Sequence, residues 1–190
     1  MIFRQLFDHN SYTYTYLIAC KKSREAIFID PVSNHIDDYL QLISELELKL
    51  KFAIDTHIHA DHITAIGNLQ KKTSCISAMG EKSKAKNLKA HLQDGEYLTI
   101  GDIKLKILHT PGHTDDSYSF YTKGKVFTGD TLLIRGTGRT DFQNGSASAQ
   151  YDSIFNKVLK LPKSTLVYPS HDYKGWTTST IGEEKKHNPR

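Results

Sequence analysis

The feature of this sequence that most constrains its fold is a crowded histidine stretch. Residues Thr56 to His62 read Thr-His-Ile-His-Ala-Asp-His, so three imidazoles and one carboxylate fall within seven positions. The mostly apolar run 50–54 leads into this stretch and predicts a strand that delivers these groups to the edge of a core. Packing such groups together costs free energy unless a cation satisfies them. The stretch therefore predicts a metal site, and an ordinary solvated loop is the alternative.

Length and composition predict one globular domain over residues 1–190, because 38% of the residues are hydrophobic. No apolar run has membrane-spanning length, and residues 1–10 lack the pattern of a secretion signal, so we expect no membrane partner and a cytoplasmic location. The formal net charge of +4 is spread along the chain, and we expect no nucleic-acid partner. Two cysteines are too few for a disulfide framework, so Cys20 and Cys75 are predicted to be buried free thiols.

The hydrophobic pattern predicts a β-rich chain whose halves are each closed by helices. Helices are expected over 35–48, with Asn34 as its cap, over 63–70 and over 149–161, and the polar segment 80–91 is either helix or loop. Two sheets packed together with helices outside are the expected arrangement. The predicted strands are 1–6, 12–20, 25–30, 50–54, 75–78, 97–100, 103–108, 118–121, 126–128 and 165–168.

Four segments carry metal-binding residue types, and each follows an apolar strand. Their histidines and aspartates can therefore converge at one sheet edge. Imidazole and carboxylate suit zinc, iron or manganese, and the lack of cysteine ligands argues against a closed structural zinc site. An open, catalytic metal site is predicted. The segments are His57-x-His59-x-Asp61-His62, Thr110-Pro111-Gly112-His113-Thr114, Phe127-Thr128-Gly129-Asp130 and Tyr168-Pro169-Ser170-His171-Asp172.

In this order, the four segments resemble the metallo-β-lactamase fold, an α+β αββα sandwich of two mixed β-sheets flanked by helices. Two groups within that superfamily share the Thr-Pro-Gly-His-Thr and Thr-Gly-Asp pieces. Glyoxalase II hydrolyses glutathione thioesters with two metals, and the persulfide dioxygenases carry one iron. The run from Leu132 to Gln143 and the His171-Asp172-Tyr173-x-Gly175 run are similar to the persulfide dioxygenases, and the resemblance covers essentially the whole chain.

The resemblance to persulfide dioxygenases implies an enzyme with one Fe(II) per chain, held by the catalytic residues His57, His113 and Asp130. Its substrates would be glutathione persulfide and dioxygen, and its products sulfite and glutathione, as in sulfide detoxification. Four further residues would then orient the ligands through hydrogen bonds. In the alternative, a glyoxalase II-type hydrolase with two zinc ions, the same four would be metal ligands. They are His59, Asp61, His62 and His171.

Glutathione carries two carboxylates, so cations and hydroxyls are expected at the rim of the site. The candidates for substrate binding are Arg139, Tyr173 and Lys174. Arg139 and Asp141 have an alternative role as an internal ion pair that braces the Gly136–Gly138 turn. A homodimer is one expected possibility for assembly. Members of the family carry a further helical segment after the position of Arg190, and whether this protein has that segment is left open.

Overall fold

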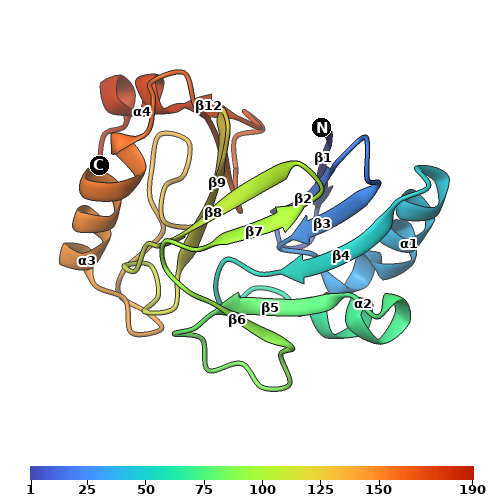
Figure 1. Ribbon diagram of the computed structural model, residues 1–190. Coiled ribbons are helices and arrows are strands. Elements are labelled where there is room, and N and C mark those ends of the chain that lie inside the picture. The colour runs from blue at the N-terminus through green and yellow to red at the C-terminus, as the bar shows by residue number, and fades with distance from the viewer.

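The computed structural model describes residues 1–190 and consists of two six-stranded sheets packed face to face. Helices α1 and α2 cover the outer face of the first sheet, and α3 and α4 cover that of the second (Figure 1). The predicted α+β αββα sandwich is confirmed. The helices are α1 (Ile36–Glu45), α2 (Ile66–Thr73), α3 (Ala147–Asp152) and α4 (Ile181–His187).

Each sheet combines parallel and antiparallel strand pairs. The first sheet has the order β1-β2-β3-β4-β5-β6 and the second β12-β11-β10-β9-β8-β7. The strands of the first sheet are β1 (Ile2–Asp8), β2 (Thr13–Ala19), β3 (Glu25–Ile29), β4 (Lys49–Ile54), β5 (Ile76–Gly80) and β6 (Ala90–Leu92). Those of the second are β7 (Tyr97–Ile100), β8 (Ile103–His109), β9 (Tyr118–Thr122), β10 (Lys125–Gly129), β11 (Leu166–Pro169) and β12 (Ser179–Thr180).

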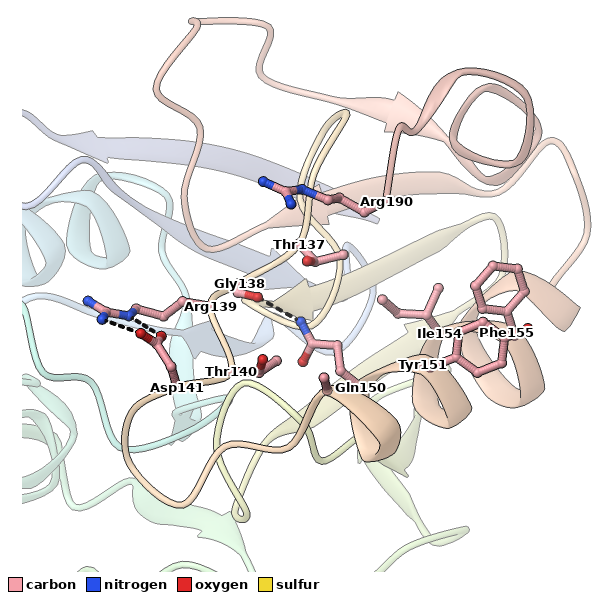
Figure 2. Close-up of a pocket in the computed structure, with 11 residues that line it drawn as sticks. Thr137, Gly138, Arg139, Thr140, Asp141, Gln150, Tyr151, Ile154, Phe155 and Arg190 are labelled. Atoms are coloured by element: carbon pink, nitrogen blue, oxygen red, sulfur yellow. Dashed lines mark hydrogen bonds and ion pairs between the residues drawn. The ribbon is translucent and has the colours of Figure 1, made fainter.

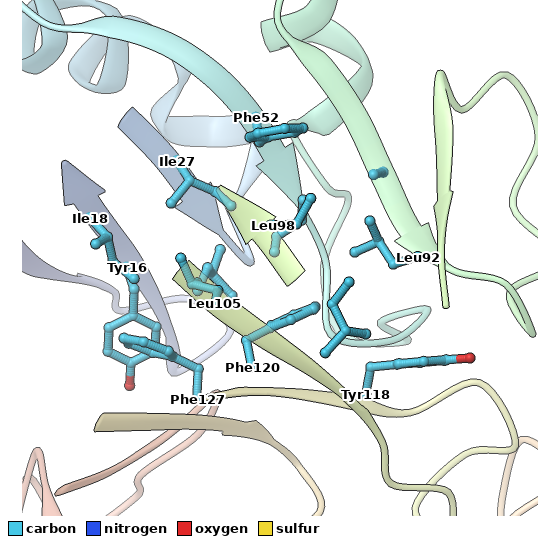
Figure 3. Close-up of a cluster of buried hydrophobic side chains, with 14 of the residues drawn as sticks. Tyr16, Ile18, Ile27, Phe52, Leu92, Leu98, Leu105, Tyr118, Phe120 and Phe127 are labelled. Atoms are coloured by element: carbon cyan, nitrogen blue, oxygen red, sulfur yellow. The ribbon is translucent and has the colours of Figure 1, made fainter. Parts of the chain in front are cut away.

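The largest apolar cluster fills the space between the two sheets (Figure 3). Successive side chains of a strand point to opposite faces, so Tyr16 and Ile18 of β2 enter this cluster while Leu17 and Ala19 face α1 and α2. Every residue of β2 is consequently buried. Burial of each large side chain contributes about 2 kcal/mol. This packing fixes the register of β2, whose first residue, Thr13, forms a backbone bridge with His171.

The carboxyl ends of several strands meet at one edge of the sandwich. In the second sheet, β10 is parallel to β11, and β8 runs in the same direction because both β8 and β10 are antiparallel to β9. In the first sheet, β3 and β4 are parallel. Backbone hydrogen bonds join the sheets at this edge, from Tyr14 N to Ser170 O and from Tyr118 N to Thr56 O, both 2.8 Å. The four predicted segments therefore converge.

The predicted strands are all present, with ends within two residues of those expected. Three short elements were missed, because β6 and β12 have too few residues for a pattern and α4 is mostly polar.

The expected Asn34 cap is wrong. Asn34 lies in the 3₁₀ turn Ser33–His35, and α1 begins after His35 with no side-chain cap. The helix expected over 149–161 is α3, continued by a π turn (Ser153–Lys157) and a 3₁₀ turn (Val158–Lys160).

Two further predictions can be compared with the structure. Cys20 and Cys75 are buried and free, as expected. The segment 80–91 is a loop that ends in β6 rather than a helix. No helix has both the length and the apolar character needed to cross a membrane.

Candidate metal centre

Asp30 organises the loop that carries the histidine stretch. It follows β3 directly, and its carboxylate accepts hydrogen bonds from Thr56 N (2.7 Å) and Thr56 Oγ1 (3.0 Å). The Ser170 hydroxyl donates to the same carboxylate. Asp30 thus ties the loop after β4 to the loop after β11. The sequence analysis missed it, although a carboxylate directly after an apolar strand is the signal that identified Asp130.

One set of candidate ligands combines His57, His113 and Asp130. One ligand atom from each lies within 4.8 Å of the others. Nε2 of His113 is 3.6 Å from Oδ2 of Asp130, and the rings of His57 and His113 are nearly perpendicular, with centroids 5.0 Å apart. The structure therefore brings together three groups that are far apart in the sequence.

Hydrogen bonds at Nδ1 orient both imidazoles of this set. The Thr56 hydroxyl donates to Asp30, so it accepts from Nδ1 of His57 at 2.9 Å. Nδ1 of His113 donates to the backbone oxygen of Arg139 at 2.8 Å. Each ring consequently keeps its Nε2 lone pair available, which is the tautomer that a metal ligand requires.

The charges in this set also suit a cation. Burial and the neighbouring His59 lower the pKa of His57 to about 3, so its ring is neutral. Burial alone would raise the pKa of Asp130, but His171, together with His57 and His113, holds it well below its usual value. Neutral imidazole and ionised carboxylate are the forms that bind metals. Two histidines and one carboxylate are also the donor set of non-haem iron sites with open positions, so these residues fit one iron.

The residues predicted around this set include a second histidine and carboxylate group. His171 bridges the two groups, since its Nδ1 is 2.8 Å from Oδ1 of Asp130 and its Nε2 is 3.1 Å from Oδ2 of Asp61. Nδ1 of His62 is 3.0 Å from the same oxygen of Asp61. Burial lowers the pKa of His171, but Asp130 and Asp61 raise it to about 10. The two carboxylates therefore favour the protonated form of His171.

The hydroxyl of Thr13 lies between these three side chains. Its Oγ1 is 3.2 Å from Oδ2 of Asp61, 3.3 Å from Nδ1 of His62 and 3.2 Å from Nε2 of His171. Thr13 is fully buried, and a backbone bridge pairs it with His171. The hydroxyl therefore lies where these three side chains approach one another. Sequence reasoning missed Thr13 because it resembles any β-branched residue of a strand.

His59 is turned toward Asp30 and lies outside the first ligand set. Its side chain is buried, and its Nε2 lies 3.3 Å from Oδ1 of Asp30. Burial lowers the pKa of His59, but the charge of Asp30 raises it to about 9. Neither ring nitrogen is aligned for a hydrogen bond, so the contact is ionic. His59 also groups within 4.8 Å with Asp61 and His62, and separately with Asp30 and Asp55.

The three candidates for substrate binding do not line one common pocket. Arg139 donates to Asp141 through Nε (2.7 Å) and Nη2 (2.9 Å), the ion pair expected as its alternative role (Figure 2). It lines a pocket of about 480 Å³ beside Tyr151. Tyr173 lines a different pocket of about 500 Å³. Lys174 Nζ lies 4.9 Å from the centre of the Trp176 ring.

The segment that carries Arg139 separates the first pocket from the candidate ligands. In Figure 2, Gln150 reaches from α3 to this segment, and its Nε2 donates to Gly138 O at 3.0 Å. Gly138 N donates to Asp130 O at 2.8 Å. A side chain at position 138 would meet Asp130 O at 2.4 Å and the His113 ring at 2.8 Å. Only glycine permits this close approach.

This sandwich of two mixed sheets, with histidines and aspartates converging at one sheet edge, is the arrangement of the metallo-beta-lactamase class of proteins. The chain belongs to the metallo-beta-lactamase superfamily, whose family model matches residues 10–171. Within that superfamily it falls in the persulfide dioxygenase family, and the chain is an enzyme.

Two persulfide dioxygenase relatives support this assignment, and a less similar relative belongs to the hydroxyacylglutathione hydrolases. The human mitochondrial persulfide dioxygenase ETHE1 is 44% identical over 100% of this chain and 76% of its own length. The crystal structure of ETHE1 from Myxococcus xanthus superposes with a TM-score of 0.98 at 51% identity, over 100% of this chain and 84% of that one. A probable hydroxyacylglutathione hydrolase of Schizosaccharomyces pombe is 36% identical, over 92% of this chain and 68% of that protein. The predicted family is confirmed.

Proposed function

We propose that this chain oxidises glutathione persulfide with dioxygen and water to sulfite and glutathione. The reaction balances as GSSH + O2 + H2O giving GSH + H2SO3. The bond between the two sulfur atoms breaks, the outer sulfur loses four electrons to dioxygen, and the inner sulfur leaves as the thiol of glutathione. Support comes from the persulfide dioxygenase relatives, which match over the whole chain.

The single observation that carries the proposal is the separation of the candidate ligands into two groups. His57, His113 and Asp130 face one another with free donor atoms. The hydroxyl of Thr13 lies within hydrogen-bond distance of Asp61 and His171, two residues that a second metal would need. We infer one metal per chain and propose Fe(II).

Bound iron would supply open coordination positions for the persulfide sulfur and dioxygen. The residues of the chain orient the ligands. Thr56 and the carbonyl of Arg139 hold the two imidazoles in orientation, and His171 holds Oδ1 of Asp130 so that Oδ2 faces the ligand set. Such fixed orientation favours a reaction whose rate depends on positioning. Arg139, Tyr173 and Lys174 remain proposed contacts for glutathione at the rim.

The second candidate is a glyoxalase II-type hydrolase of glutathione thioesters with two zinc ions. The observation that favours it is the retention of His59, Asp61, His62 and His171 at the same edge. The hydrolase relative from S. pombe, at lower identity, agrees with it.

Oxygen uptake separates the two candidates. The iron-loaded protein is mixed with glutathione persulfide in an oxygen electrode, and in parallel with a glutathione thioester while thiol release is followed. We expect oxygen consumption with the persulfide and no thioester cleavage above background. Thioester cleavage without oxygen demand would support the hydrolase instead. A cytoplasmic location and a homodimer stay predictions, and the mammalian relatives are named as mitochondrial.

A further inference from the structure

A second pocket, of about 500 Å³, is lined mainly by aromatic rings. Phe7 of β1 lines it, and the centroid of its ring lies 4.9 Å from that of Tyr14 and 6.1 Å from that of Tyr12. Tyr12 in turn lies 5.8 Å from Tyr173. These four rings come from two distant parts of the chain, the β1–β2 hairpin and the loop after β11, and we call them the aromatic pocket.

Two features of the aromatic pocket oppose stability in the free protein. Tyr12 has a φ of 59°, in the left-handed region that residues other than glycine rarely adopt. Its side chain and that of Tyr173 are also well exposed, with 49% and 70% of their residue surfaces accessible. Strained backbone and exposed rings gathered at one place are typical of ligand sites.

Asp172 adds a negative charge to the wall of the aromatic pocket. It is only 6% exposed, and its oxygens accept hydrogen bonds from Lys174 N (3.0 Å) and Thr177 N (2.9 Å). No lysine, arginine or histidine forms an ion pair with it. Burial and the charge of Asp172 raise the pKa of the Tyr14 phenol. The pocket therefore combines π faces with an acid that lacks a cationic partner.

The aromatic pocket shares a wall with the candidate metal centre. The Tyr173 ring stacks on His171, with an interplanar angle of 8° and centroids 6.0 Å apart. His171 in turn contacts Asp130 at 2.8 Å. Tyr173 therefore lies between the aromatic pocket and the side chains of the candidate metal centre.

We propose that the aromatic pocket binds the α-ammonium group of glutathione persulfide, at the γ-glutamyl end of the molecule. Aromatic rings attract ammonium groups through their π faces, and a buried carboxylate beside them strengthens the attraction. Glutathione carries a single ammonium group, far from its sulfur. The inference rests on the proposed function for the identity of the ligand, whereas the cation chemistry rests on the pocket itself.

The test compares glutathione persulfide with its N-acetyl derivative, in which an uncharged amide replaces the ammonium. For the wild type, we expect acetylation to raise KM about threefold to thirtyfold with little change in kcat, as expected for loss of one cation-π site. In Tyr12→Leu, KM for glutathione persulfide should rise, and the KM values for the two persulfides should become equal. Tyr97→Leu is the matched control, since Tyr97 is an exposed tyrosine of β7 outside the pocket. For Tyr97→Leu, the ratio of the KM values for the two persulfides should equal that of the wild type.

Equal KM values for the two persulfides in the wild type would overturn the inference, as would unchanged discrimination in Tyr12→Leu. Absence of oxygen uptake with both persulfides would instead count against the proposed function. Calorimetric titration with glutathione and N-acetylglutathione then tests, without turnover, whether the aromatic pocket binds the ammonium group. Weaker binding of the acetylated form by the wild type, and equal binding by Tyr12→Leu, would support it, and equal binding by the wild type would overturn it.

Discussion

The Thr13 hydroxyl oxygen lies 3.2 Å from Nε2 of His171. The same oxygen lies 3.2 Å from Oδ2 of Asp61 and 3.3 Å from Nδ1 of His62, and it accepts a hydrogen bond from Ser11 at 2.8 Å. One uncharged group thus lies among three candidate metal-binding side chains. The hydroxyl can donate one hydrogen bond, to Asp61, and both imidazoles also lie within hydrogen-bond distance of that carboxylate. We infer that a cation binding all three groups would have to displace the hydroxyl. The site retains candidate ligands for two metals. Because the Thr13 hydroxyl lies among the second group of candidates, we propose that the site holds one metal.

Thr13→Ala is expected to allow a second metal. Removal of the hydroxyl leaves Asp61, His62 and His171 without their shared partner, and a divalent ion can then satisfy them. Loaded with zinc, the variant should bind two ions per chain and the wild type one, as counted by plasma mass spectrometry. Thr15→Val, at a buried threonine two residues along β2, is the control and should bind one. One zinc in Thr13→Ala would show that the hydroxyl does not determine the count.

Substitution of His57 and His59 should have different consequences. His57→Ala removes a proposed ligand and should abolish iron binding. His59→Ala should keep the iron but slow turnover by about 10-fold to 100-fold, because His59 acts through Asp30 on the loop that holds His57. Loss of its ionic partner should also destabilise the fold by about 3 kcal/mol. Iron content, oxygen uptake and urea unfolding measure these effects. Equal iron loss in both variants would favour the two-metal site.

Gly138→Ala is expected to weaken metal binding from outside the ligand set. The added methyl group would collide with Asp130 O and the His113 ring, so one or both ligands must shift. We expect about 1–3 kcal/mol of destabilisation and at least a severalfold loss of iron affinity, measured by chelator competition. Gly67→Ala in α2, where an added methyl meets nothing within 4 Å, is the control. It should leave affinity unchanged, and wild-type affinity in Gly138→Ala would contradict the account.

A partly buried network around Asp8 and His35 predicts a pH-dependent contribution to stability. Nε2 of His35 lies 2.9 Å from Asp8. A hydrogen bond with Asp38, together with Asp8, outweighs burial and raises the pKa of His35 above 6.5. Burial alone would raise the pKa of Asp8, but hydrogen bonds from Ser11 and the contact with His35 lower it below 3.8.

The signs of these two shifts define the pH window. Because the folded pKa of His35 is raised, its contribution is complete below pH 6.5 and disappears as the pH rises through the raised value. Because the folded pKa of Asp8 is lowered, its contribution is complete above pH 3.8 and disappears as the pH falls. His35→Gln should therefore lose more unfolding free energy at pH 5.5 than at pH 9, measured in urea. His91→Gln, at an exposed histidine without an ionic partner, should show no such difference. An equal loss at both pH values would refute the assignment.

The sequence was sufficient to predict the sandwich and the convergence of its metal-binding residues. His57, His113, Asp130 and His171 each follow an apolar strand, and strands with apolar faces pack into sheets whose carboxyl ends share an edge. The strands predicted over 97–100 and 103–108 are also present, as β7 and β8, which pair with each other. These signals are local, so they can be read without a partner strand.

What the sequence could not provide depends on contacts between distant segments. Thr13 gains its role only because the register of β2 brings its hydroxyl against the loop after β11. The orientation of His59 depends on Asp30, which lies 29 positions earlier and carries no motif. α4 was missed because its polar residues have tertiary partners instead of an apolar stripe. Its buried Glu184 pairs with Arg135.

The most direct test of the central claim is the stoichiometry of one reaction in protein of known metal content. The chain is loaded with Fe(II), its iron is counted, and oxygen consumption and sulfite formation are measured together with glutathione persulfide. We predict one iron per chain and one dioxygen consumed for each sulfite formed. Two metal ions per chain, with no oxygen consumed and with cleavage of a glutathione thioester, would contradict the account.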